Sequence, residues 1–245
     1  MEEKTPPEQD NKKRYYTVEE YLEFERKSSG KHEYYKGEIF PVGDGLEHSI
    51  IINEPAVDYT KQRYTIEEYL EMERASDIKH EYYQGQIFAM AGTSPSHNFI
   101  HSNVLMETGI QLRKKGCKPL GSDMRLHIPE NTLFTYPDIA IYCGDRSTSE
   151  FNNDTIIHPT IIIEILSKST RDYDLTTKFD FYQKIPTLKE YILIDSERIG
   201  VTSFRIDAHN RWMSEDYKTL EDTVLIPTVG VSLSMKDIYD RVEFI

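Results

Sequence analysis

Apolar residues recur along the chain with two periods, and these periods separate the expected helices from the expected strands. In residues 96–116 the apolar side chains follow helical spacing, so a helix is expected to begin after an N-cap at Ser96 and to end at Gly116. Residues 170–185 predict a second helix, and residues 234–242 predict a short third one.

Runs rich in apolar and β-branched residues predict the strands. They cover residues 117–129, 131–143, 160–166 and 189–195, and residues 201–218 read as a hairpin. Strands that are interspersed with helices are typical of a sheet with helices on its flanks. We therefore expect an α/β fold with a mixed sheet, flanking helices and an added C-terminal β-hairpin.

One residue disagrees with the pattern around it. Residues 160–166 read as a strand that is buried on both faces, yet Glu164 lies in its middle. An ionised carboxylate in a dry interior costs several kcal/mol unless something compensates the charge. The compensation could be a buried ion pair, which is structural, or a bound metal ion, which is chemical.

The chain contains an internal duplication. Residues 16–40 recur as residues 64–88, with 18 identities in 25 aligned positions. Each copy has a threonine followed three residues later by a glutamate, which predicts a helix that begins with a capping box. The helix is followed by a strand that carries a glycine at a turn or bulge. Two copies are too few for a solenoid.

The duplication suggests a division of the chain. We expect residues 1–14 to be a disordered tail, residues 15–60 to be a partial duplicate of residues 63–104, and residues 61–245 to form the main domain. Because the copies share their helix and strand pattern, the first could compete with the second for one docking surface, in the same chain or in a dimer partner.

Composition limits the binding partners and the cellular location that we expect. The formal net charge is −13 over 245 residues, which argues against loose, sequence-independent coating of nucleic acid. No apolar run is long enough to cross a membrane, and because the N-terminal residues are charged we expect no secretory signal there. The two cysteines, Cys117 and Cys143, form no CxxC motif, so we expect unpaired thiols and a cytoplasmic protein.

Three charged positions suggest chemistry. Asp138 follows Pro137 in a strand-like run, and Glu164 lies in the next strand, so the two carboxylates can meet at one edge of the sheet. Mg²⁺ is bound by one or two carboxylates together with water and substrate phosphates. Lys178 lies four residues after Asp174 on one helix face and could stabilise phosphoryl charge.

These motifs together resemble a known family. The set comprises PD at 137–138, E-x-L-S at 164–167, D-x₃-K-x₃-Y at 174–182 and EYILID at 190–195. It resembles the Uma-type restriction endonuclease family of the PD-(D/E)XK nuclease superfamily. The segments YTIEEYLEMER, KHEYYQGQIFAMAG and SPSHNFIHSNV are similar to the N-terminal half of that family, so the resemblance spans roughly residues 63–240.

The resemblance implies a restriction-endonuclease-like fold and an endonuclease that cleaves DNA with Mg²⁺ or Mn²⁺. Asp138 and Glu164 would be metal ligands, Glu81 would add a carboxylate, and His97 would lie near the site. Leu166 stands where the superfamily has a lysine, so we expect Lys178 to act as a migrated lysine, with Lys168 as the alternative. The first copy, which has no partner motifs of this kind, would be silent.

Further expectations concern binding. Candidate phosphate contacts are basic residues, namely Arg113, Lys114, Lys115 and Lys168, and cutting both strands would favour a homodimer. Each candidate also has a plain alternative: Asp138 could end a strand, Glu164 could belong to a structural ion pair, and the lysines could be solvated. The rival functions are a degenerate nuclease fold that binds DNA or assembles with proteins, and a hydrolase of a small phosphodiester.

Overall fold

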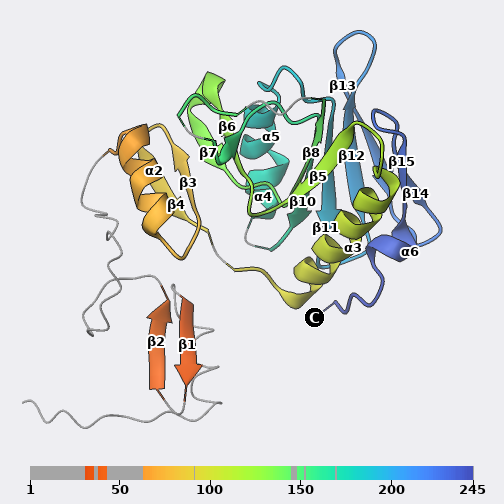
Figure 1. Ribbon diagram of the computed structural model, residues 1–245. Coiled ribbons are helices and arrows are strands. Elements are labelled where there is room, and N and C mark those ends of the chain that lie inside the picture. Colours follow the sequence, from red (N-terminus) through yellow and green to blue (C-terminus); the bar gives the residue numbers. More distant parts are fainter. Residues whose placement is uncertain are drawn as a thin grey trace, which may run out of the picture.

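A computed structural model describes residues 63–90, 92–144, 148–151, 153–168 and 170–244, together with the backbone of two strands at 31–35 and 38–42 (Figure 1). Among the described residues, no helix is both long and apolar enough to cross a membrane. The first fourteen residues, for which a disordered tail was predicted, lie outside the described part.

The larger sheet has six strands in the order β13-β12-β11-β10-β8-β5. Strands β10 and β11 run parallel, and the other neighbours are antiparallel, so the sheet is mixed as expected. Its strands are β5 (Cys117–Gly121), β8 (Ile139–Cys143), β10 (Ile161–Leu166), β11 (Glu190–Asp195), β12 (Val201–Ile206) and β13 (Trp212–Tyr217).

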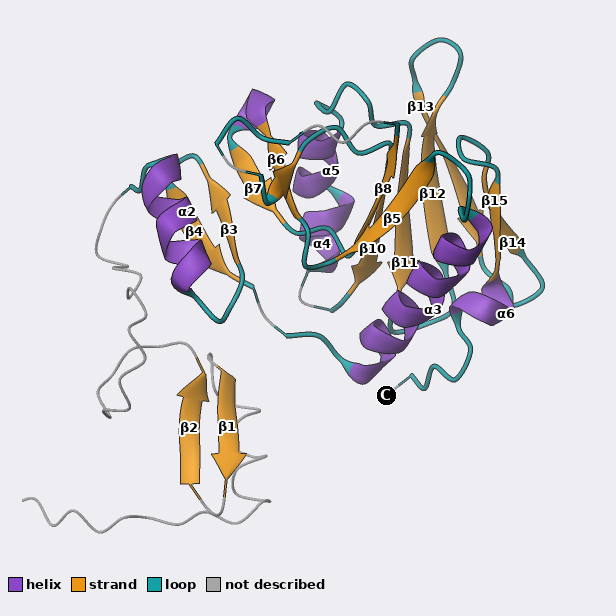
Figure 2. Ribbon diagram, viewed as in Figure 1, coloured by secondary structure: helices purple, strands orange, loops and turns teal. Residues whose placement is uncertain are grey.

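Helices cover both faces of this sheet. Helix α3 (Pro95–Gln111) lies on one face, in contact with α6 (Met235–Ile238) and with the hairpin of β14 (Thr223–Ile226) and β15 (Val231–Ser234), as Figure 2 shows. Helices α4 (Arg171–Leu175) and α5 (Thr177–Tyr182) follow β10 and lie on the other.

The alternation of side chains along β10 decides which way Glu164 points. Ile161, Ile163 and Ile165 belong to the core beneath α3, whereas Ile162 and Leu166 pack with Tyr182 of α5. Because successive side chains of a strand point to opposite faces, Glu164 points toward α4 and α5. Lys178 of α5 lies on this same face.

A second sheet has the strand order β4-β3-β7-β6-β9. Helix α2 (Ile66–Ala75) packs on it through an aromatic cluster that includes Tyr69, Tyr82 and Phe134. The strands are β3 (His80–Tyr83), β4 (Gln86–Ala89), β6 (Arg125–Ile128), β7 (Leu133–Thr135) and β9 (Thr155–Ile156), and a 3₁₀ turn at Pro129–Asn131 joins β6 to β7.

Two predicted strands are in fact four. Residues 117–129 divide into β5 and β6, and residues 131–143 divide into β7 and β8, with one half of each in either sheet. In the second case the break falls at Tyr136–Asp138, where Pro137 lacks the N–H that a continuous ladder needs. The chain therefore changes sheets at Asp138, which lies just before β8 rather than inside a strand.

Three further predictions need correction. The N-cap of α3 is Ser94, whose hydroxyl accepts from the His97 N–H, and not Ser96. The helix expected over 170–185 is interrupted at Thr176, where φ is −122° and ψ is −85°. The segment after α2 is a hairpin rather than one strand, because Gln84 and Gly85 take positive φ values of 47° and 90° in a tight turn.

The duplicated segment repeats this hairpin. Strands β1 (Lys31–Tyr35) and β2 (Glu38–Val42) pair antiparallel with Glu33 opposite Phe40, and β3 and β4 pair with Glu81 opposite Phe88. The capping box predicted for α2 is confirmed at Thr65 and Glu68. The matching helix of the first copy lies outside the described residues, and the proposed division of the chain stays a prediction.

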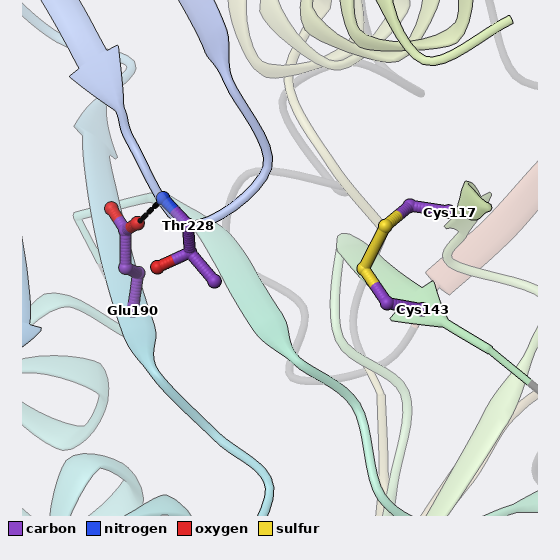
Figure 3. Close-up of a disulfide and its surroundings, with 4 residues drawn as sticks. All are labelled: Cys117, Cys143, Glu190 and Thr228. Carbon is purple, nitrogen blue, oxygen red and sulfur yellow. Dashed lines mark hydrogen bonds between the residues drawn. A yellow bond between two sulfur atoms is a disulfide. The ribbon is translucent and has the colours of Figure 1, made fainter. Parts of the chain in front are cut away.

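The expectation of unpaired thiols is wrong. Cys117 and Cys143 face each other on the neighbouring strands β5 and β8 and form a disulfide (Figure 3). The sequence could not reveal this, because the pairing depends on the register of two strands, and the cysteines are 26 residues apart in the sequence. The cytoplasmic location was inferred from unpaired thiols and stays a prediction.

Loss of this disulfide should destabilise the protein. Cross-linking a loop of this length stabilises a fold by roughly 3 kcal/mol through the entropy of the unfolded chain. We expect the Cys117→Ala, Cys143→Ala variant to lose about that much of its free energy of unfolding in urea. Titration of the denatured wild type with a thiol reagent should find no thiol before reduction; two thiols before reduction would contradict the pairing.

A buried histidine should make the fold sensitive to acid. His127 of β6 stacks on Phe134 with ring centroids 4.0 Å apart, and burial lowers its pKa to about 4. The ordinary pKa of histidine is about 6.5. The contribution of the neutral His127 to the free energy of unfolding is therefore fully present above pH 6.5, and it falls by about 3 kcal/mol in all as the pH drops toward 4. Urea unfolding between pH 4 and 7 should show this decline, and His127→Phe should flatten it. An unchanged slope in the variant would assign the decline to other groups.

Candidate active site

The change of sheets at Asp138 brings two carboxylates together. Strands β8 and β10 are antiparallel neighbours with Ile139 opposite Ile163, so Asp138 lies beside Glu164. The Asp138 N–H donates to Glu164 Oε2 at 3.2 Å, and the Ile165 N–H donates to Asp138 Oδ2 at 2.7 Å. Each carboxylate is thus fixed by the backbone of the other's strand.

Lys178 of α5 compensates the buried charge of Glu164. Its Nζ lies 2.9 Å from Glu164 Oε1, 3.4 Å from Asp174 Oδ1 and 3.7 Å from Glu81 Oε1. The Tyr182 hydroxyl also donates to Glu164 Oε1, at 2.7 Å. Glu164 is 3 % exposed and Lys178 is 6 % exposed, so both side chains are largely buried. The lysine is the helical one that the sequence favoured.

Burial and charge oppose each other in this cluster. Desolvation raises the pKa of Glu164 to about 8, although the nearby Lys178 ammonium lowers it. Burial also disfavours the charge of Lys178, but the surrounding acidic groups, Glu164 first, raise its pKa well above the ordinary value. Lys178 therefore remains a cation that several acidic side chains share.

Two histidines of α3 contact Asp138 from the face of the sheet opposite to α5. His97 Nε2 lies 3.2 Å from Asp138 Oδ2, and His101 Nε2 lies 3.0 Å from the Asp138 carbonyl oxygen. Burial would raise the pKa of Asp138, but His97 and the Ile165 N–H together lower it below its usual range. Asp138 and Glu164 therefore differ, and Asp138 is the more readily ionised.

The cluster lies in a cavity of about 700 Å³. The cavity is lined by residues of β3, β4, α3, β10, α4 and α5 and the loops between them. Its polar lining includes Glu81, Ser94, His97, Tyr136, Asp138, Glu164, Lys168, Tyr173, Asp174 and Lys178. All five residues expected at the catalytic site are therefore together, and Lys168 joins them at the cavity wall.

The other expected basic contacts lie elsewhere. Arg113, Lys114 and Lys115 follow the C-terminal end of α3, whereas His97 is in its first turn. A helix of 17 residues is about 25 Å long. Lys115 Nζ instead donates to the Gly230 carbonyl oxygen at 2.9 Å. These three residues are not at the cavity.

Two contributing residues were given no site role by the sequence. Asp174 is 4 % exposed and shares Lys178 with Glu164, and His101 binds the Asp138 backbone. Both stand one helical turn from a residue that was singled out, Asp174 before Lys178 and His101 after His97. This spacing of four residues is the sequence signal that could have identified them.

The oxygen donors of Asp138 and Glu164 are of the type that binds a divalent cation. Among the described residues no group of three or more histidine, cysteine, aspartate or glutamate side chains is arranged to hold a metal ion. Mg²⁺, however, keeps several waters and needs only one or two protein carboxylates. Asp138 and Glu164 supply two hard oxygen donors at the wall of an open cavity, which suits Mg²⁺ or Mn²⁺.

Comparison with known proteins identifies the family. Residues 66–236 match the Uma2 family, described as "Putative restriction endonuclease". The chain belongs to the Uma2 family. This match confirms the resemblance drawn from the motifs and includes every residue expected at the catalytic site.

Two relatives and one solved structure are also similar to this chain. Protein slr1290 of Synechocystis, which is uncharacterized, is 29 % identical over 92 % of both chains, and protein sll1609 of the same organism is 31 % identical over 51 % of this chain and 70 % of its own. A crystal structure from Anabaena variabilis, titled a "putative nuclease belonging to DUF820", superposes with a TM-score of 0.61 at 21 % identity. It covers 74 % of this chain and 99 % of its own. The fold is thus restriction-endonuclease-like, as expected.

Proposed function

We propose that this Uma2 protein hydrolyses phosphodiester bonds of DNA with the help of Mg²⁺ or Mn²⁺. The observation that carries the proposal is the meeting of Asp138 and Glu164 in one cavity, with Lys178 Nζ 2.9 Å from Glu164. Two acidic ligands and a fixed cation are the groups that phosphoryl transfer requires, because its catalysis depends on positioning and charge stabilisation.

Each side chain has a distinct role in this proposal. Asp138 and Glu164 would hold the metal ion, which when bound supplies charge stabilisation and a more acidic water. Tyr182 and the Asp138 N–H fix the carboxylate of Glu164, and His97 fixes that of Asp138. Lys178 would present positive charge to a phosphate that enters the cavity.

DNA as the substrate is supported by the family and by the basic groups near the cavity. A phosphate that reaches Lys178 must pass the acidic surface of a chain with net charge −13, so local basic groups matter. Lys168 stands at the cavity wall and is the candidate for a backbone phosphate contact. A homodimer would place two such cavities on one duplex, which would allow both strands to be cut.

A cleavage assay tests the proposal. We expect the wild type to nick supercoiled plasmid or to cut single-stranded DNA with Mg²⁺ or Mn²⁺ and not with EDTA. A purified, folded Asp138→Ala, Glu164→Ala variant should lose this activity. Equal metal-dependent cleavage by both proteins would show that the site assignment is wrong.

One observation favours a second candidate function. Lys178 already lies within 3.7 Å of three carboxylates, so the cluster has charge compensation of its own. Such a site could persist in a module that binds DNA or other proteins without cutting. Calorimetric titration with Mg²⁺ and Mn²⁺ separates the two, because a degenerate site should take up neither ion.

A further inference from the structure

The second copy of the duplication, residues 64–88, completes the fold by covering a defined surface of the domain. Strand β3 pairs with β7, with Tyr82 opposite Phe134, and the Tyr136 hydroxyl donates to Glu73 Oε1 at 2.7 Å. Lys79 Nζ lies 2.7 Å from Asp123 Oδ1 at the rim. We call the surface formed by residues 122–125 and 133–136 the dock.

The first copy preserves the residues that the dock receives. The buried residues of the second copy are Tyr69, Leu70, Met72, Glu73, His80, Tyr82, Gly85 and Ile87. Their counterparts are Tyr21, Leu22, Phe24, Glu25, His32, Tyr34, Gly37 and Ile39. Only the pair Met72 and Phe24 differs, and both side chains are large and apolar.

The remaining sequence differences between the two copies lie at positions that the dock does not bury. They lie at positions whose second-copy residues are exposed or partly exposed, namely Ile66, Ala75, Asp77, Ile78, Gln84 and Gln86. The two hairpins also have the same register, so Glu33 stands opposite Phe40 as Glu81 stands opposite Phe88. The first copy therefore has the same or similar residue types at the positions that the dock buries, and the same strand pairing.

We propose that residues 16–40 exchange in cis with residues 64–88 on the dock. After an exchange, residues 41–94 would join Phe40 to α3, where residues 89–94 now join Phe88 to it. The longer connection spans the same gap easily, and the entropy of closing a loop grows only logarithmically with its length. Glu33 would then stand in the place of Glu81 near Lys178.

The same chain is favoured over a second chain as the source of the segment. Residues 41–63 join the first copy covalently to the second, and such a tether gives a high effective concentration that a separate molecule must match by its own concentration. The proposal does not depend on the nuclease activity, because it concerns which segment completes the fold.

Zero-length cross-linking reads out which copy is docked. A carbodiimide should join Lys79 to Asp123, whose charged atoms are 2.7 Å apart, and Lys31 is the counterpart of Lys79. In full-length Tyr69→Ala, Leu70→Ala protein we expect the Lys31–Asp123 link to rise at least about tenfold over wild type, because two buried anchors of the second copy are lost. The matched Tyr21→Ala, Leu22→Ala variant should show only the Lys79–Asp123 link.

Each outcome decides the proposal. The link should join peptides of one chain when ¹⁵N-labelled and unlabelled protein are mixed. A Lys31–Asp123 link confined to mixed-label pairs would place the segment of a second molecule on the dock and overturn exchange in cis. Absence of the link in the folded variant, or loss of the far-ultraviolet circular dichroism of either variant, would also overturn it.

Discussion

Glu164→Gln should lower metal-dependent cleavage by at least about 10³-fold. The charge stabilisation that a bound metal supplies is worth several kcal/mol, and each 1.36 kcal/mol is a factor of ten in rate. Glutamine keeps the size of the side chain and can still accept from Tyr182, so the change removes the charge and one of two acceptor oxygens but leaves the packing nearly the same. Turnover of plasmid or single-stranded DNA with saturating Mn²⁺ measures the effect.

A matched control exists in the neighbouring strand. Glu190 of β11 is also buried, its Oε1 accepts the Thr228 N–H at 2.9 Å, and it does not line the cavity (Figure 3). Glu190→Gln makes the same chemical change in the same sheet and should keep the wild-type rate. If the two variants lose activity equally, a metal-ligand role for Glu164 is wrong.

Local patterns were sufficient to find two central residues of the candidate site. Glu164 is conspicuous because a charge interrupts an apolar strand, and Lys178 because helical spacing places it on the same face as Asp174 and Tyr182. Both inferences rest on periodicity within one element. The structure brings these residues within hydrogen-bonding distance of one another.

Features that depend on pairing between distant strands were not predictable in this way. The disulfide requires β5 beside β8 with Cys117 opposite Cys143, and neither residue carries a local sign of that register. The passage of the chain between two sheets at Pro137 had a local sign, the missing N–H, but its consequence for Asp138 appears only once both sheets are assembled.

Removal of Lys178 should be the most damaging single change to stability. Lys178→Met keeps the aliphatic stem but leaves Glu164 without its ammonium, and breaking a buried ion pair from one side costs about 3–5 kcal/mol. Urea unfolding at pH 8 should show this loss. Lys184→Met, at an exposed position just after α5, should change stability by no more than about 0.5 kcal/mol.

The pKa of Glu164 decides how the stability deficit of Lys178→Met changes with pH. The pKa of Glu164 is raised by burial to about 8 in the folded protein, above the 4.5 of the free group, and loss of Lys178 should raise it further. A group with a raised folded pKa stabilises the fold below its unfolded pKa, and that contribution is lost as the pH rises through the folded value. The deficit of Lys178→Met should therefore be smaller at pH 5 than at pH 8, and Glu164→Gln in the same chain should restore part of it. A deficit that is independent of pH and of Glu164 would mean that Lys178 stabilises the fold by packing alone.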